Sequence, residues 1–432
     1  MLEIDEGVGS PQPLPKLVAG RDLPGSRQQG GEHLPRLFLQ RDADAVQVQL
    51  ALILVELEPL ESKPHAAFPT QFTTNSPPVH RLVGPRRTTV RDSGGAMKPA
   101  GLLLILGIST AAGVLADGER AVNGTVWTAN RGAHSIAAFD AATGDLIRTV
   151  PMAAASQPGD LAYAKGKVYV AEEFGTPPAV AIIDADTGAI LHRITFAAGA
   201  RPHHVHASTG GKLVAVGLFG TDRVAVIDTL DDVVIGEWDS NTATTSGRIH
   251  AGVFSPDGNL LYLANEGAGE LVAMDPRSGA VLWRLAIPQI HELVVTHDGK
   301  TGYVTRRTAN RLAVVDLETP SYADILTLGL PDTLSLSANE KLLTVGLRVA
   351  PARLAVIDTE SLAVTLVPLS AADESNTIAG HQWTAPSGRF TFVSFEGGAQ
   401  PGLAVVDHQA GHAVVQRLPY SGRPHGMDYS PK

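Results

Sequence analysis

Seven copies of one sequence unit follow one another between residue 121 and the end of the chain. Each copy contains an apolar strand that ends in aspartate, such as VAIID or LAVVD, and successive aspartates lie 41 to 49 residues apart. A further strand and a turn such as Ser-Pro-Asp-Gly come before it, so each unit supplies short antiparallel strands. A period of roughly 40–45 residues with four strands is typical of a β-propeller blade. The aspartates are Asp140, Asp184, Asp228, Asp275, Asp316, Asp358 and Asp407.

The two ends of the repeated region complement each other. The chain ends in GRPHGMDYSPK, which has the pattern of the first strand of a unit with nothing after it. The region begins with AVNGTVWTANRGAHSIAAFD, which has second and third strands but no first strand. Pairing the last strand of the chain with these strands completes a blade and removes an exposed sheet edge. The predicted fold is therefore all-β, a seven-bladed β-propeller over residues 117–432 with four antiparallel strands per blade.

The repeated aspartates have a structural explanation. A carboxylate at a strand end accepts hydrogen bonds from backbone N–H groups of the next turn, and a following glycine supplies positive φ. We therefore expect these aspartates to stabilise turns and assign them no catalytic role. The sequence contains no Walker loop, G-x-S-x-G or H-E-x-x-H motif, so no catalytic residue is assigned.

The composition excludes several classes of function. The chain has no cysteine, which rules out disulfides and thiolate metal sites. Its net charge is −10, which disfavours nucleic acid or anionic lipid as the main partner.

A second start of the chain is predicted at Met97. Residues 97–116, MKPAGLLLILGISTAAGVLA, have the pattern of a cleaved secretory signal peptide. The apolar run is shorter than the roughly 20 residues that span a bilayer, so we expect no membrane span after cleavage. Residues 1–96 are expected to be an over-extended reading frame or a disordered segment. The expected location is periplasmic or secreted.

Histidine recurs at the start of the predicted innermost strands. When the units are aligned on the turn that follows, one position per blade is equivalent. Because the first strand of each blade borders the central channel, these side chains are expected to form a ring at one mouth of the channel. Its occupants in ring order are His425, Gly159, His203, His250, His291, Asp332 and His381.

Charged residues are predicted at the same mouth. Neighbouring strands in a blade run in opposite directions, so the end of the second strand lies beside the start of the first. Glu173, Glu266, Arg306, Arg348 and Glu396 occupy such ends and are the predicted ligand-contacting residues. Asn130 and Phe219 occupy the other two ends.

Clustered imidazoles with carboxylates nearby suggest a metal site. Neutral imidazole binds transition metals, and three imidazoles with one carboxylate or water would suit zinc. The predicted ligands are His203, His250, His291, Asp332, His381 and His425, with zinc or copper as the ion and a haem-type ligand less favoured. The alternative is that these histidines are generic polar lining copied by repeat duplication, with His204 and His206 packing between blades or supporting the site.

The repeat resembles that of the YVTN-type β-propellers. The resemblance is clearest in Arg248–Gly279, RIHAGVFSPDGNLLYLANEGAGELVAMDPRSG. A weaker similarity to haem d1 and lactonase-like propellers lies in the segment AVGLFGTDRVAVID. The resemblance implies the fold and leaves three functions open. The first is an exported, carrier-like protein that binds a metal ion or metal-bearing small ligand. The second is a non-enzymatic scaffold for a periplasmic protein or cell-envelope partner. The third is a lactonase-like hydrolase or lyase, so an enzyme is the less favoured class.

Overall fold

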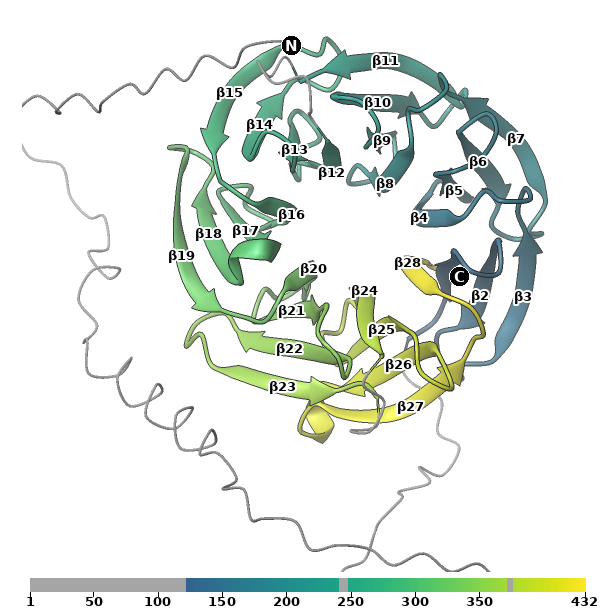
Figure 1. The fold of residues 1–432 in the computed structure, drawn as a ribbon, viewed down its shortest axis with the longest axis vertical. Helices are drawn as coiled ribbons and strands as arrows, with labels where there is room; N and C mark the ends of the chain where they lie inside the picture. The colour runs from purple at the N-terminus through teal and green to yellow at the C-terminus, as the bar shows by residue number, and fades with distance from the viewer. Residues whose placement is uncertain (1–121, 241–247, 371–375) are drawn as a thin grey trace, which may run out of the picture. The chain divides into compact units, whose positions relative to one another are not determined.

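Seven four-stranded antiparallel sheets stand around a central axis (Figure 1). The computed structural model describes residues 122–240, 248–370 and 376–432. The predicted β-propeller of four-stranded blades is therefore confirmed. The predictions for residues 1–96 and 97–116 lie outside the described residues. Within the described part of the chain, no helix is long and apolar enough to cross a membrane.

In six blades the strands follow the chain from the axis outward, and in the seventh the innermost strand comes from the end of the chain. The innermost strands are β4 (Pro158–Ala164), β8 (Pro202–Ala207), β12 (Ile249–Phe254), β16 (Ile290–Val295), β20 (Pro331–Leu336), β24 (Ile378–Thr384) and β28 (Pro424–Ser430). The second strands are β5 (Lys167–Glu172), β9 (Leu213–Leu218), β13 (Leu261–Asn265), β17 (Thr301–Arg306), β21 (Leu342–Leu347), β25 (Phe390–Glu396) and β1 (Thr125–Asn130).

The third and fourth strands complete the blades. The third strands are β6 (Ala179–Asp184), β10 (Arg223–Asp228), β14 (Glu270–Met274), β18 (Arg311–Asp316), β22 (Arg353–Asp358), β26 (Gly402–Asp407) and β2 (Ser135–Asp140). The outermost strands are β7 (Ile190–Thr195), β11 (Val233–Asp239), β15 (Val281–Ala286), β19 (Ser321–Thr327), β23 (Val364–Pro368), β27 (Ala413–Pro419) and β3 (Leu146–Pro151). Two short 3₁₀ helices, η1 (Arg307–Ala309) and η2 (His408–Ala410), lie in turns.

The ring closes through the two ends of the repeated region, as predicted. Strand β28 pairs with β1 in the sheet β28-β1-β2-β3. The seam also has a buried side-chain link, in which the Trp127 indole Nε1–H donates to the Ser430 hydroxyl at 2.9 Å. Trp127 is fully buried, so this blade joins residues 303 positions apart in one packed layer.

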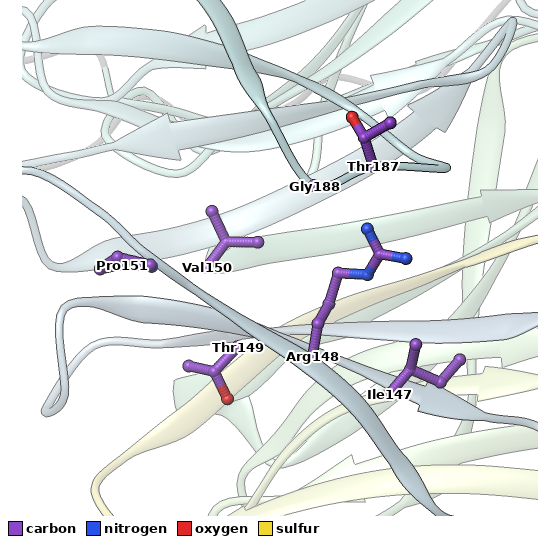
Figure 2. A pocket seen from close by; sticks show the side chains of 7 residues that line it. All are labelled: Ile147, Arg148, Thr149, Val150, Pro151, Thr187 and Gly188. Carbon is purple, nitrogen blue, oxygen red and sulfur yellow. The ribbon is translucent and has the colours of Figure 1, made fainter.

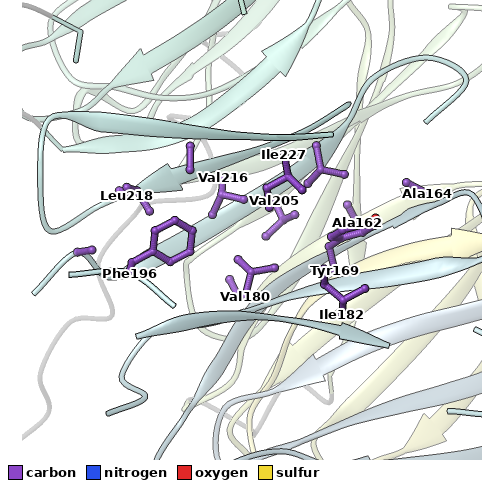
Figure 3. Close-up of a cluster of buried hydrophobic side chains, with 14 residues drawn as sticks. Ala162, Ala164, Tyr169, Val180, Ile182, Phe196, Val205, Val216, Leu218 and Ile227 are labelled. Carbon is purple, nitrogen blue, oxygen red and sulfur yellow. The ribbon is translucent and has the colours of Figure 1, made fainter. Parts of the chain in front are cut away.

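The hydrophobic core is divided among the junctions between neighbouring blades. Each of seven buried clusters contains side chains from two adjacent sheets. Figure 3 shows the one between the sheets of β4–β7 and β8–β11, where Tyr169 and Ile182 face Val216 and Ile227. Because a blade buries its two faces only against neighbours, apolar burial favours the closed ring over an open array.

The repeated aspartates act in the turns, as predicted. Each accepts at least one hydrogen bond from a backbone N–H two or three residues further on. Asp184, for example, accepts from the Thr187 N–H at 2.7 Å, and Gly188 follows with φ +76°. These carboxylates are thus part of the strand connections.

The seam predicts a strong effect of a short C-terminal deletion. Removing residues 424–432 deletes β28, exposes the edge of β1 and opens the packing around Met427. We expect the shortened protein to lose its cooperative thermal unfolding transition. We also expect it to aggregate, as seen by size-exclusion chromatography. Removing only residues 431–432, which are exposed, is the matched control and should change Tm by no more than about 2 °C. An unchanged Tm after the longer deletion would contradict the closure.

Candidate functional site

A β-bulge lies near the start of every innermost strand. In all seven blades the pairing of the first two strands shifts register there. In β8, for instance, Pro202 pairs with Leu218 and Val205 with Val216, which leaves His203 and His204 between them. A bulge re-aims side chains that strict alternation would send to opposite faces. Both histidines therefore join the channel cluster.

The bulges create two tiers of channel residues. The mouth tier comprises Gly159, His203, His250, His291, Asp332, Gly380 and His425. The inner tier, one residue further along each strand, comprises Asp160, His204, Ala251, Glu292, Thr333, His381 and Gly426. The register corrects one prediction: Ala379 pairs with Phe395 as Pro202 pairs with Leu218, so His381 is equivalent to His204 and not to His203.

The predicted mouth residues largely converge. They line a chamber of about 180 Å³, here called the mouth chamber. Its lining includes His203, His250, His291, Asp332, His381 and His425, with Glu266 and Arg348 from the predicted charged set. Glu173 and Glu396 are buried behind it, where each bonds to arginines of the mouth.

The prediction for Arg306 is wrong in placement. Its guanidinium turns to the outermost strand β19, where Nη1 lies 2.7 Å from Asp324 Oδ1. Arg307 lines the mouth chamber instead, and Arg131 takes the corresponding place after β1, where Asn130 was expected. Both follow the last paired residue of the second strand, so an alignment on that residue would have found them.

Arginines pair with carboxylates around the mouth. Arg131 Nη2 lies 3.1 Å from Glu173 Oε2, and Arg348 Nη2 lies 3.0 Å from Glu396 Oε1. Arg307 Nη1 lies 2.9 Å from Asp332 Oδ1. Burial raises the pKa of Glu173, but its hydrogen bond and attraction to His203 and the charges of Arg131 and Arg201 outweigh this and hold it at about 2.

Two carboxylates orient histidines of the mouth tier. His203 Nδ1 lies 3.1 Å from Glu173 Oε2, which leaves the other ring nitrogen available. His291 Nε2 lies 2.7 Å from Asp332 Oδ1, and its Nδ1 lies 3.8 Å from Glu266 Oε2. Carboxylates that bond one imidazole nitrogen commonly set the tautomer of a metal-ligating histidine.

Six imidazoles form one contiguous cluster. Ring centroids are 3.8 Å apart for His250 and His291, 4.2 Å for His204 and His250, and 4.9 Å for His203 and His250. The series continues to the next blades, with 4.8 Å between His204 and His381 and 4.6 Å between His381 and His425. The His425 Nδ1 lies 3.1 Å from the Gly159 carbonyl oxygen, which holds that ring in place.

Burial keeps most of these rings neutral. It lowers the pKa of His203, and it lowers the pKa values of His204, His250, His381 and His425 well below the usual range. Within this cluster of six rings, four buried nitrogens have no hydrogen-bond partner among the described residues: His204 Nδ1, His250 Nδ1, His291 Nδ1 and His381 Nε2. Such atoms cost free energy unless a ligand or water engages them.

Several sets of these atoms are close enough to bind one ion. One potential ligand atom each from His250, Glu266 and His291 lie within 4.8 Å of one another, as do those of His203, His204 and His250. His250 belongs to both sets. The other predicted ligands, Asp332, His381 and His425, surround this centre without joining these two sets.

A larger hollow of about 410 Å³ lies on the outer rim (Figure 2). It is formed by β3 and the turn at Thr187 and Gly188, and Arg148 is its one charged side chain. Convergent polar groups mark ligand sites better than volume does, so the channel is the candidate site.

The fold and site define a seven-bladed β-propeller with a histidine-lined polar channel. A family model described as outer membrane protein assembly factor BamB matches residues 132–292 and 220–321. A search of curated proteins finds no match to the chain.

Solved propellers share the fold at low identity. Kuenenia stuttgartiensis hydrazine synthase is 18% identical, with a TM-score of 0.54 over 68% of this chain and 98% of that one. A putative 6-phosphogluconolactonase from Bacteroides uniformis is 16% identical, with 0.55 over 71% and 100%. The dihydro-heme d1 dehydrogenase NirN in complex with DHE is 17% identical, with 0.51 over 71% and 75%. Similarity to lactonase and haem d1 propellers is thus confirmed for the fold, while the YVTN-type repeat stays a prediction.

The ion-pair network predicts a contrast between two carboxylates. Glu173→Ala leaves Arg131 and His203 without their buried partner and should lower the free energy of unfolding by about 3–5 kcal/mol. Asp324→Ala removes the partner of Arg306 at the surface and should cost under about 1 kcal/mol. Urea unfolding followed by circular dichroism measures both. Equal losses would contradict the buried role of Glu173.

The environment of Asp160 predicts that the stability of the metal-free protein depends on pH. Burial raises its pKa to about 7. The folded state therefore holds a proton that the unfolded state releases near pH 4, and this contribution to stability is lost as pH rises from about 4 to 7. Asp160→Asn should leave Tm near wild type at pH 4 and exceed it at pH 8. Equal Tm differences at both pH values would contradict this.

Proposed function

We propose that this protein is an exported carrier that binds a transition-metal ion at the channel mouth. The main observation is the cluster of buried imidazoles in which one ligand atom each from His250, Glu266 and His291 lie within 4.8 Å of one another and two of them, His250 Nδ1 and His291 Nδ1, have no hydrogen-bond partner among the described residues. In this arrangement His250 and His291 bind the ion through Nδ1, and Glu266 supplies a carboxylate oxygen. The His203 ring is also in contact with His250, with ring centroids 4.9 Å apart. Imidazole nitrogen with one carboxylate suits zinc or copper.

The surroundings support a ligand site over passive lining. Glu173 and Asp332 orient His203 and His291, and each carboxylate is anchored by arginines. A carboxylate anchored in this way keeps its imidazole in one tautomer, which prepares the free nitrogen for the ion. Generic polar lining gives no reason to combine fixed tautomers with free nitrogens that lie within 4.8 Å of other possible ligand atoms.

The size of the mouth chamber favours an ion or small complex over a macrocycle. Its volume of about 180 Å³ is below the roughly 300–1,000 Å³ of pockets that enclose drug-sized ligands. The ring centroids around His250, 3.8 to 4.9 Å apart, also leave no slot for a flat macrocycle between the histidines. A haem-type ligand is therefore the less supported alternative.

Export is part of the proposal on two grounds. Residues 97–116 have the pattern of a secretory signal, and the matching family model is named for an outer membrane assembly factor. A periplasmic carrier would release its ion to a partner protein. The chain lacks cysteine, so its metal ligands are nitrogen and oxygen atoms that do not oxidise in an oxidising compartment.

Metal titration of histidine variants tests the proposal. Full-length protein is stripped with a chelator and titrated with zinc or copper by calorimetry, and bound metal is counted by mass spectrometry. The triple substitution His203→Ala/His250→Ala/His291→Ala should remove one equivalent, and His250→Ala alone should weaken that equivalent at least 100-fold. His297→Ala, which changes an exposed histidine in the turn between β16 and β17, is the control and should bind as wild type.

The outcomes separate the classes of function. Unchanged metal binding in the triple variant, with its fold intact by circular dichroism, would return these histidines to the architecture of the repeat. The non-enzymatic scaffold would then become the leading interpretation.

A further inference from the structure

The channel holds a second chamber on the far side of the inner tier. This far chamber has a volume of about 230 Å³, and its lining includes Asp160, His206, Glu292, His381 and Asp428. The lining consists of described residues, and none of them is lysine or arginine. The mouth chamber, in contrast, is lined by Arg131, Arg307 and Arg348. The two ends of the channel therefore differ in charge.

Unpartnered polar atoms point to a ligand in the far chamber. Glu292 Oε2, His206 Nε2 and His204 Nδ1 are buried and have no hydrogen-bond partner among the described residues. The Glu292 side chain is only 6% exposed and that of His204 1%. Glu292 and His206 line this chamber, and His204 Nδ1 lies beside the Glu292 carboxylate. Unpaired buried atoms of this kind are costly to leave without a cation or water.

The three residues are close enough to act together. One ligand atom each from His204, His206 and Glu292 lie within 4.8 Å of one another. His204 Nδ1 is 3.9 Å from Glu292 Oε1 and 3.4 Å from Asp160 Oδ2. His381 Nδ1 lies 3.5 Å from the other oxygen of Asp160.

We propose that the far chamber is a second, separate divalent-cation site, with His204 Nδ1, His206 Nε2 and Glu292 as ligands and Asp160 as an additional carboxylate. Two carboxylates balance the charge of a divalent ion, and mixed oxygen and nitrogen ligands suit manganese as well as zinc. The proposal does not depend on the mouth site, because His204 Nδ1 faces the carboxylates of the far chamber, whereas the proposed mouth ion is bound by His203, His250, His291 and Glu266.

Local structure accounts for the placement of this site. His204 belongs to the inner tier because of the bulge in β8, and His206 follows two residues later on the same face of the strand. Glu292 reaches the inner tier through the equivalent bulge in β16. These strands belong to the third and fifth blades of Figure 1 counted from the seam, and the ring brings them to the same channel.

Manganese binding to full-length, chelator-stripped protein tests the site. Free Mn²⁺ is counted by its electron paramagnetic resonance signal during titration with MnCl₂ alone. Wild type should bind one equivalent at the far chamber. His206→Ala and Glu292→Gln should each raise its Kd at least 10-fold, whereas His250→Ala should change it less than 3-fold. Thermal unfolding confirms that each variant is folded, and His206→Asn serves as a second variant if Glu292→Gln does not fold.

The result distinguishes this site from the mouth site. Loss of zinc in the His203/His250/His291 variant with retained Mn²⁺ binding would support two sites. If the mouth chamber does not bind zinc, the Mn²⁺ titration still tests the far chamber, because it uses Mn²⁺ alone. Folded His206→Ala and Glu292→Gln proteins that bind Mn²⁺ as wild type would overturn the proposal, and so would wild type that binds none. A single equivalent lost equally in the His250→Ala and His206→Ala variants would show one shared site around His204 and would also overturn it.

Discussion

Packing between neighbouring blades is the interaction on which the rest of this structure depends. Each blade buries its faces only against adjacent blades, so all seven junctions must form together. Pairing of β28 with β1 completes the blade at the seam, which then packs against both of its neighbours as the other blades do. The ring then sets how near the innermost strands approach one another. That distance, in turn, brings imidazoles from neighbouring blades into contact.

The channel is the place where this architecture buries polar side chains at a cost in free energy. Small bulges at the start of each innermost strand send two consecutive side chains inward instead of one. The result is a dense set of histidines and carboxylates in a space that favours neutral forms. Rings that lose their charge keep a free nitrogen lone pair, and carboxyls such as Asp160 hold a proton. In such a site the protein alone leaves several polar atoms without hydrogen-bond partners. A cation would bind several of these atoms at once.

Charge divides the channel along its length. Arginines anchor the carboxylates of the mouth, so Glu173, Asp332 and Glu396 act mainly through the groups that they position. The carboxyls of the far chamber have no such anchors among the lining residues. One channel thus offers an imidazole-rich environment at the mouth and a mixed carboxylate environment beyond it. The two would select cations of different ligand preference.

The sequence by itself determined the blade count, the strand order and the closure, because strand patterns and turn signals are local and repeat along the chain. It also placed His203, His250 and His291 at the channel mouth. Only the tertiary structure decided the finer placement. Arg307 and not Arg306 faces the chamber, because the mouth position follows the last paired residue of the second strand. His381 falls in the tier of His204, because the bulge in β24 changes the direction of the side chains at that point. No pattern in a single strand reveals that shift. The far chamber depends on it throughout, since residues from separate blades meet there only when the ring is closed.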